Sequence, residues 1–252
     1  MEWYLYPAVV LVGFLAGFIN TLAGGGSAIS LPFLIFLGLP VNVANGTNRI
    51  AILLQNATGT ASFAREKVLD FKSSIPLLLA SIAGAIFGAL IAINLNEVIM
   101  RRMVGTVLII MLLLVIFKPD IWIRSQAGKT GSRNIMLSIL IFFLIGAYGG
   151  FIQVGTGFFL LAGLVLYERF NLLKANAIKV LIILVYTPMA LLIFILNDQV
   201  NYKLGLILAA GNMLGAWIGS KVAISWGPKF IRWVLIAALL FSALRLFEII
   251  KM

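Results

Sequence analysis

The chain contains no cysteine and no histidine, and only 8 of its 252 residues are aspartate or glutamate. The missing thiols and imidazoles exclude disulfides, thiol chemistry and the usual zinc and haem ligands. The acidic residues Glu66, Asp70, Glu97 and Asp198 lie near the ends of hydrophobic segments and not within them. We therefore expect no metal site, no cofactor, no catalytic residues and no enzymatic activity, since an intramembrane enzyme needs such groups at depth.

Hydrophobic side chains dominate what is present, with 62% of residues hydrophobic and 11% charged. An average soluble domain has about 45–50% apolar and about 25% charged residues. Apolar runs such as 75–93, 104–117 and 180–196 have the length of helices that cross the ~30 Å hydrocarbon core of a bilayer. We expect an all-α polytopic membrane protein that is surrounded by membrane lipids.

The hydrophobic segments fall into two sets of five, separated by the polar stretch 118–134. The first set comprises residues 3–20, 27–39, 42–63, 73–93 and 97–117. The second set comprises residues 135–153, 158–167, 172–196, 204–224 and 229–247. We therefore divide the chain into a first membrane repeat (1–117), a cytoplasmic linker (118–134) and a second membrane repeat (135–252).

The second set repeats the first at a fixed separation, called here the repeat offset. Gly24 corresponds to Gly155 and Asn45 to Asn176, because 155 − 24 and 176 − 45 are both 131. Further pairs with the same offset are Gly26 with Gly157, Gly84 with Gly215, Gly88 with Gly219 and Arg101 with Arg232. Each set crosses the membrane an odd number of times, so the two repeats are predicted to have inverted topology.

The net charge of +11 would suggest nucleic acid in a soluble protein, but here the basic residues are spread over the loops between segments, and we expect no nucleic-acid partner. Of the 19 lysines and arginines, 13 fall on the side of the membrane that holds the linker. The positive-inside rule makes that side cytoplasmic. The protein is thus expected in the cytoplasmic (inner) membrane of a bacterium or archaeon, with both termini extracytoplasmic.

Two glycine-rich breaks interrupt the sequence at corresponding places, at residues 24–27 and 155–157. Segments 27–39 and 158–167 follow them and are too short to span a bilayer alone, so they either span jointly with a neighbour or re-enter. Non-helical backbone survives in lipid only where protein or a water-filled cavity satisfies it. Because helix N-termini attract anions and glycine permits close approach, the breaks predict an anion site near the midplane.

Tight helix packing is the alternative reason for glycines in membrane segments. We adopt it for the glycines of three segments, namely Gly13, Gly17, Gly84, Gly88, Gly211, Gly215 and Gly219. At the two breaks, polar residues that packing does not require favour a ligand site instead. These residues are Asn20, Ser27, Gln153 and Thr156.

Segments 42–63 and 172–196 place basic residues about two turns inside their starts, at Arg49 and Lys179. A cation within a membrane span is costly and is a functional candidate by default, the alternative being that each side chain snorkels to the nearer interface. Asn45 and Asn176 are either donors to an anion or caps and packing residues. Deeper polar residues, which either line a path or cross-link helices, are Gln55, Asn56 and Thr58.

At these residues the chain resembles the sulfite exporter TauE/SafE family. The resemblance rests on G-F-x-A-G-x-x-x-x-x-x-G-G-G-S at residues 13–27, on Pro32, and on A-x-G-T-N at residues 44–48. Residues 146–157 and 175–177 keep the pattern more loosely, and the second break departs from it at Thr156 and Phe158. The resemblance implies two inverted five-segment halves and transport of organosulfur anions such as sulfite, thiosulfate or sulfonates.

We therefore expect a secondary exporter or facilitator for small organic or inorganic sulfur oxyanions, such as sulfite, sulfonates or sulfoacetate-like anions, and a homodimer is compatible with a carrier of this size. An anion that leaves an inside-negative cell gains about 2.3 kcal/mol per charge per 100 mV, so export needs no coupling ion. The alternatives are a carrier for another anion or a metal ion, and a non-transporting assembly subunit. The residues expected to bind substrate are Asn20, Gly24, Gly25, Gly26, Ser27, Asn45, Asn48, Arg49, Gln153, Gly155, Thr156, Gly157, Asn176 and Lys179.

Overall fold

The computed structural model describes residues 5–69, 71–117 and 134–222. These residues form helices and no strands, which confirms an all-α protein. The first half contains α1 (Leu5–Ala23), α2 (Ser27–Phe36), α3 (Val41–Arg65), α4 (Phe71–Ile93) and α5 (Glu97–Phe117). The second half contains α6 (Ile135–Phe151), α7 (Thr156–Ala162) with the short π-helix η2 (Gly163–Tyr167), α8 (Leu172–Leu196) and α9 (Tyr202–Val222).

Several helices have the length and composition of membrane spans. Within the described residues, Leu5–Leu22, Ser74–Ile93 and Leu173–Leu196 meet both criteria. Large apolar side chains such as Leu11, Leu79 and Leu196 are exposed on the outer surface, as lipid-facing residues are. The chain is therefore a polytopic membrane protein, as its composition predicts.

The first helix, α1, continues three residues beyond Asn20, where the first hydrophobic segment was expected to end. In its last turn Thr21 Oγ1 donates to Gly17 O at 2.9 Å, so the hydroxyl is satisfied within the helix. The helix ends where Gly24, with a φ of +84°, adopts the left-handed conformation that glycine alone tolerates easily. The expected end at Asn20 is wrong because polar side chains alone do not stop the helix.

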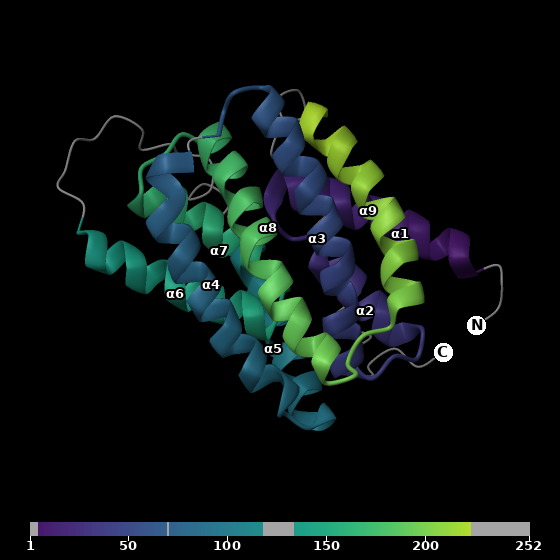
Figure 1. The fold of residues 1–252 in the computed structure, drawn as a ribbon. Coiled ribbons are helices and arrows are strands. Elements are labelled where there is room, and N and C mark those ends of the chain that lie inside the picture. Colours follow the sequence, from purple (N-terminus) through teal and green to yellow (C-terminus); the bar gives the residue numbers. More distant parts are fainter. Residues whose placement is uncertain (1–4, 70, 118–133, 223–252) are drawn as a thin grey trace.

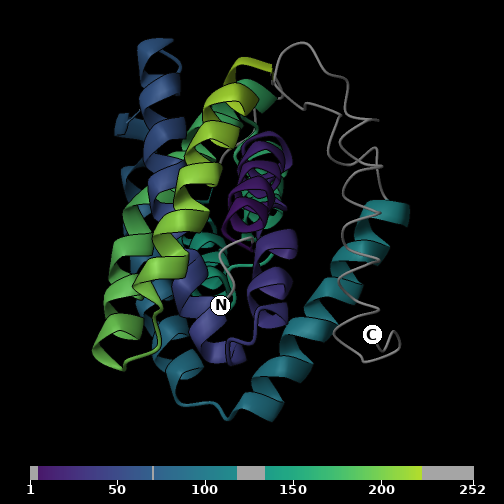
Figure 2. The same ribbon diagram turned by 90° about the vertical axis from the view of Figure 1, so that its right-hand side faces the viewer.

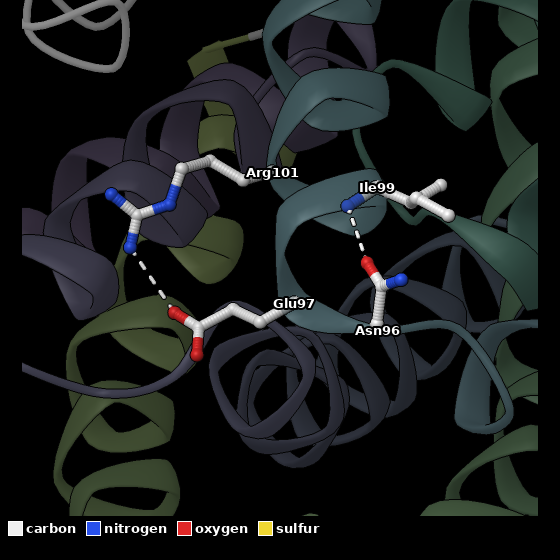
Figure 3. Close-up of polar contacts among 4 residues, drawn as sticks. All are labelled: Asn96, Glu97, Ile99 and Arg101. Carbon is white, nitrogen blue, oxygen red and sulfur yellow. Dashed lines mark hydrogen bonds and ion pairs between the residues drawn. The ribbon is translucent and has the colours of Figure 1, made fainter.

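The start of α5 is fixed by local polar contacts (Figure 3). Asn96 Oδ1 accepts a hydrogen bond from the Ile99 N–H at 2.9 Å, which caps one of the free N–H groups of the first turn. One turn later Arg101 Nη2 donates to Glu97 Oε1 at 3.1 Å. Both side chains are exposed, so this pair stabilises the helix by only about 0.3–0.5 kcal/mol.

The two halves interlock through their outer helices. The first helix of each half packs along the fourth helix of the other half, α1 against α9 and α4 against α6 (Figures 1 and 2). Glycines make these pairs close: a Cβ on Gly84 would strike Phe143 O, and one on Gly215 would strike Phe14 O. The packing role that the sequence predicts for these glycines is confirmed.

The centre of the bundle is formed by α3 and α8, two 25-residue helices that lie side by side (Figure 1). Gly46, near the start of α3, lies against the Phe194 side chain near the end of α8. Gly59, near the end of α3, lies against Val180 in the first half of α8. The two helices therefore run antiparallel, which is the relation that an inverted repeat requires of its equivalent helices.

The unusual backbone conformations recur at the repeat offset found in the sequence. All described residues with positive φ fall into three pairs, and the members of each pair are separated by that offset. The pairs are Gly24 with Gly155, Gly38 with Arg169, and Lys67 with Asp198. Arg169, Lys67 and Asp198 have side chains that rarely adopt this conformation, so their shared positions support a duplicated backbone.

The loops gather at two opposite ends of the bundle. At one, called here the Ser62 end, Ser62 Oγ lies 2.9 Å from Ser220 Oγ, which brings together the ends of α3 and α9. At the other, called the Asn42 end, Asn42 Nδ2 donates to Leu95 O at 2.8 Å. This grouping matches the predicted loop sides, in which the Ser62 end is cytoplasmic. Which end faces the cytoplasm stays a prediction, and both termini, nearly all of the linker and segment 229–247 lie outside the described residues.

Candidate functional site: two broken helices that meet inside the bundle

The two glycine breaks are in direct backbone contact. A Cβ on Gly24 would overlap the Cα and carbonyl carbon of Gly157, and one on Gly157 would overlap Gly24 in return. Gly24 and Gly155 also share the left-handed conformation, with φ values of +84° and +73°. Glycine is thus required here both by conformation and by space. The two breaks therefore meet inside the protein.

The start of α2 presents backbone donors inside this junction. The first N–H of this helix to donate within the backbone is that of Ala28, which bonds to Gly25 O at 3.0 Å. Over the described residues, the N–H groups of Gly25, Gly26 and Ser27 have no backbone acceptor, as expected for the first turn of a helix. All three residues are buried, so these donors lie in the interior of the protein.

Arg49 of α3 reaches the end of the broken helix of the other half. Its side chain is 0% exposed, which excludes the snorkelling alternative. Nη2 donates to Gly150 O at 2.6 Å, and Nη1 donates to Gly149 O at 3.1 Å and to Gln153 Oε1 at 3.3 Å. The guanidinium carbon also lies 4.6 Å from the centre of the Phe194 ring. The cation therefore caps the C-terminus of α6, where the helix dipole favours positive charge.

Lys179 of α8 makes the corresponding contact with the first half. Its side chain is 1% exposed, and Nζ donates to Asn20 O at 3.1 Å and to Thr21 O at 3.3 Å. Those carbonyls belong to the last turn of α1. Each basic residue thus holds the broken helix of the opposite half, a relation that the sequence alone does not reveal.

The two asparagines near the starts of the central helices use their donors in the same way. Asn45 Nδ2 donates to Phe151 O at 2.8 Å, and Asn176 Nδ2 donates to Thr21 O at 2.9 Å. Their Oδ1 atoms are buried and, within the described part of the chain, have no hydrogen-bond partner. In the structure these amide groups position the helix ends, and the role of Asn45 and Asn176 as donors to an anion stays a prediction.

Other donors near the junction are unpaired. Asn48 Oδ1 accepts from Ser30 Oγ at 2.7 Å, which fixes the amide beside the first turns of α2. Asn48 Nδ2 and Arg49 Nε are both buried and have no partner among the described residues. An unpaired buried donor costs about 1–3 kcal/mol, so a ligand that accepts hydrogen bonds here recovers that energy.

No acidic side chain of the described residues forms an ion pair with either buried cation. Burying a cation in a membrane is expensive even when carbonyl groups surround it. Arg49 and Lys179 therefore create a positive region at the junction of the two breaks. This region can stabilise an anion, and it disfavours a cation by the same electrostatics.

All fourteen residues expected to bind substrate are buried in the structure. Some use their polar groups locally: Thr156 Oγ1 donates to Gln153 O at 3.1 Å. Three residues of this region were missed by sequence reasoning, namely Ser30, Phe194 and Tyr186, whose Oη accepts from Gln153 Nε2 at 3.0 Å. The repeat offset could have revealed Tyr186, because it pairs this residue with the polar Gln55.

The chain matches the sulfite exporter TauE/SafE family over residues 9–246. A relative from Sinorhizobium sp., a probable membrane transporter protein named ORF9, is 31% identical over 98% of this chain and 94% of its own. The probable membrane transporter protein YfcA of Escherichia coli K12 is 27% identical, over 97% of this chain and 90% of its own. No solved structure gives a significant match. The protein belongs to the sulfite exporter TauE/SafE family of membrane transporters.

Proposed function

We propose that the protein carries small sulfur oxyanions across the cytoplasmic membrane, and that the anion binds where the two broken helices meet. The observation that carries this proposal is the pair of buried cations, Arg49 and Lys179, which have no acidic partner among the described residues. A membrane protein keeps such charges inside its spans when they act on a substrate. An anion supplies the missing negative charge.

The groups that would hold the anion are the unpaired donors. The N–H groups of Gly25, Gly26 and Ser27 form the positive end of α2, and Asn48 Nδ2 lies beside that helix. Arg49 Nε adds a charged donor. Sulfite is pyramidal and a sulfonate group is tetrahedral at sulfur, and each presents three oxygens. These oxygens accept several hydrogen bonds at once, so a cluster of donors suits them.

The contacts between the halves support transport and not static binding. Each end of the broken helices is held by residues of the opposite half, Arg49 for α6 and Lys179 for α1. Movement of one half relative to the other changes these contacts and the site together. Alternating access around a fixed midplane site, as inverted repeats provide, follows from such coupling. The membrane potential then drives an anion outward without a coupling ion.

Uptake into proteoliposomes tests the proposal. Purified protein is reconstituted and exposed to sulfite, ethanesulfonate, thiosulfate and phosphate, with an inside-positive potential to draw the anion in. We expect uptake of at least one sulfur oxyanion that is faster than in protein-free vesicles. Arg49→Gln should abolish it, whereas Arg101→Gln, which alters an exposed pair, should not. Uptake of none of these anions, or full activity in Arg49→Gln, would refute the proposal.

A further inference from the structure

Three polar residues mark one face of α3 at regular intervals. Asn48, Gln55 and Ser62 are each seven residues apart, which is two helical turns, so their side chains lie on the same side of the helix. Seven residues correspond to a rise of about 10 Å. The face therefore leads in two steps from the start of α2, where Asn48 bonds to Ser30, to the Ser62 end of the bundle.

Helix α9 lies along this face in a defined register. At its beginning a Cβ on Gly205 would meet the Ile50 side chain of α3. Near its end Ser220 lies 2.9 Å from Ser62. The two helices thus run in the same direction, and the position midway along this stretch of α9, residue 212, is level with residue 55 of α3.

Polar residues occupy both of these positions. Asn212 is seven residues after Gly205, whose face contacts α3, and its backbone also packs against Gly17 of α1. Gln55 is seven residues before Ser62, whose face contacts α9. Asn212 is 0% exposed and Gln55 is 1% exposed. Over the described residues, neither Asn212 Nδ2, Asn212 Oδ1 nor Gln55 Oε1 has a hydrogen-bond partner. Unpaired buried amides cost stability, so another role is needed to explain them.

The equivalent positions in the other half have no such unpaired atoms. The repeat offset pairs Gln55 with Tyr186 and Asn212 with Ser81. The Tyr186 hydroxyl accepts from Gln153 Nε2 at 3.0 Å, and Ser81 Oγ donates to Phe142 O at 3.3 Å. The counterparts of Ser62 and Ser220 are the apolar Ile193 and Ala89. Of the two central helices, only α3 therefore continues a polar face to the end of the bundle.

We propose that the face of α3 with Asn48, Gln55 and Ser62, together with Asn212 and Ser220 of α9, is the route between the central site and the Ser62 end. The inference rests on the proposed anion transport. The amide groups of Gln55 and Asn212 form a polar station about 10 Å from Asn48. There they hydrogen-bond to the anion or to its water molecules, in place of the hydration that the anion loses inside the protein. The face of α8 leads to the opposite end and lacks this station.

The natural absence of cysteine gives a direct test with single-cysteine variants. Gln55→Cys and Asn212→Cys are reconstituted and treated with the anionic reagent 2-sulfonatoethyl methanethiosulfonate, itself a small sulfonate. We expect both cysteines to be modified, and ethanesulfonate at saturating concentration to slow the reaction. Ile193→Cys and Ala89→Cys, at places equivalent to Ser62 and Ser220, are the matched controls and should remain unmodified. Unmodified cysteines at 55 and 212 in protein that still transports, or equal modification at all four positions, would overturn the proposal.

Leucine variants provide a second measurement that does not depend on thiol chemistry. Gln55→Leu and Asn212→Leu should lower the rate of ethanesulfonate uptake about tenfold, the effect of one hydrogen bond lost to an ion. The thermal shift caused by ethanesulfonate should persist, because the central site is intact. Ser81→Ala should retain the wild-type rate. Uptake at the wild-type rate in both leucine variants would refute the route but leave the carrier proposal standing. The carrier proposal itself fails if the wild type takes up none of the anions or if Arg49→Gln keeps full activity.

Discussion

The two buried cations hold corresponding helix ends by different means. Arg49 donates to two carbonyls of α6 and to the Gln153 side chain, and it lies over the Phe194 ring. Within the described part of the chain, Lys179 donates only to two backbone carbonyls of α1. Arginine offers five donors in a planar fork and lysine a single ammonium, so the second break is held in a more specific geometry than the first.

The remaining residues of the two breaks differ in the same way, since the second break is held by more side chains than the first. The second break is braced by side chains, with Gln153 bonded to Tyr186 and Tyr148 Oη donating to Val154 O at 2.5 Å. The first break consists of three glycines followed by Ser27, and over the described residues the N–H groups of Gly25, Gly26 and Ser27 have no backbone acceptor. We infer that the first break supplies open N–H donors for the anion, whereas side-chain hydrogen bonds fix the geometry of the second break.

The largest expected effect separates the two cations from each other. Arg49→Gln leaves two helix-end carbonyls and Gln153 without their charged donor, and Lys179→Gln removes fewer contacts. Removing a hydrogen-bonded buried charge costs about 2–5 kcal/mol, so we expect anion transport to fall by at least about 30-fold, with Arg49→Gln the more severe. Initial uptake rates in proteoliposomes measure this. Equal and mild losses of uptake in both variants would contradict the predicted difference between Arg49 and Lys179.

The contact between the breaks is tested by alanine at two glycines with similar φ. A Cβ at Gly24 would enter the backbone of Gly157, whereas at Gly38, with a φ of +90°, nothing lies within 4 Å. Both substitutions carry conformational strain of about 1 kcal/mol, but Gly24→Ala adds overpacking of about 1–3 kcal/mol. Thermal unfolding in detergent should show a clearly larger drop for Gly24→Ala. A similar drop in both variants would mean that the two breaks do not touch.

A smaller effect is expected where the second break is braced by one hydrogen bond. Tyr186→Phe removes the acceptor for Gln153 Nε2 and keeps the ring in place. The loss of one such bond destabilises by about 0.5–1.5 kcal/mol. We expect a modest fall in thermal stability together with a weaker ethanesulfonate affinity, since Gln153 also holds Arg49. An unchanged affinity would show that anion binding does not depend on the hydrogen bond between Gln153 and Tyr186.

The smallest effect is expected far from the junction. Arg101→Ala breaks the exposed pair with Glu97 and leaves the helix cap at Asn96 intact (Figure 3). Exposed pairs contribute about 0–1 kcal/mol, so stability and uptake should stay close to those of the wild type. A large loss of uptake in this variant would show that positive charge anywhere in the protein supports transport, and not the two buried cations in particular.

Much of this arrangement is readable in the sequence. Apolar segment lengths predicted the helices closely, and α8 was bounded at residues 172 and 196 as in the structure. The glycine breaks and the buried cations were also identified, because glycine clusters and charges inside apolar runs are costly in lipid and therefore stand out. The repeat offset then indicated which pairs of residues to compare.

The partners of these residues could not be predicted. That Arg49 bonds to carbonyls of residues 149 and 150 depends on how α3 packs against α6, and backbone acceptors leave no mark in the sequence. Asn45 illustrates the same limit, since the hydrogen bond from its amide to Phe151 O could not be foreseen. The polar station at Gln55 and Asn212 also needs the register of α3 against α9, which only the fold defines.

Equilibrium binding of radiolabelled ethanesulfonate to purified protein tests the central claim, that an anion binds between the two broken helices under the charge of Arg49 and Lys179. Wild type, Arg49→Gln, Lys179→Gln and the exposed control Arg101→Gln are compared at the same low salt. We predict saturable binding in wild type and in Arg101→Gln, and binding weakened at least about tenfold in each of the other two variants. Unchanged affinity in both Arg49→Gln and Lys179→Gln, with folded protein in each case, would contradict the account.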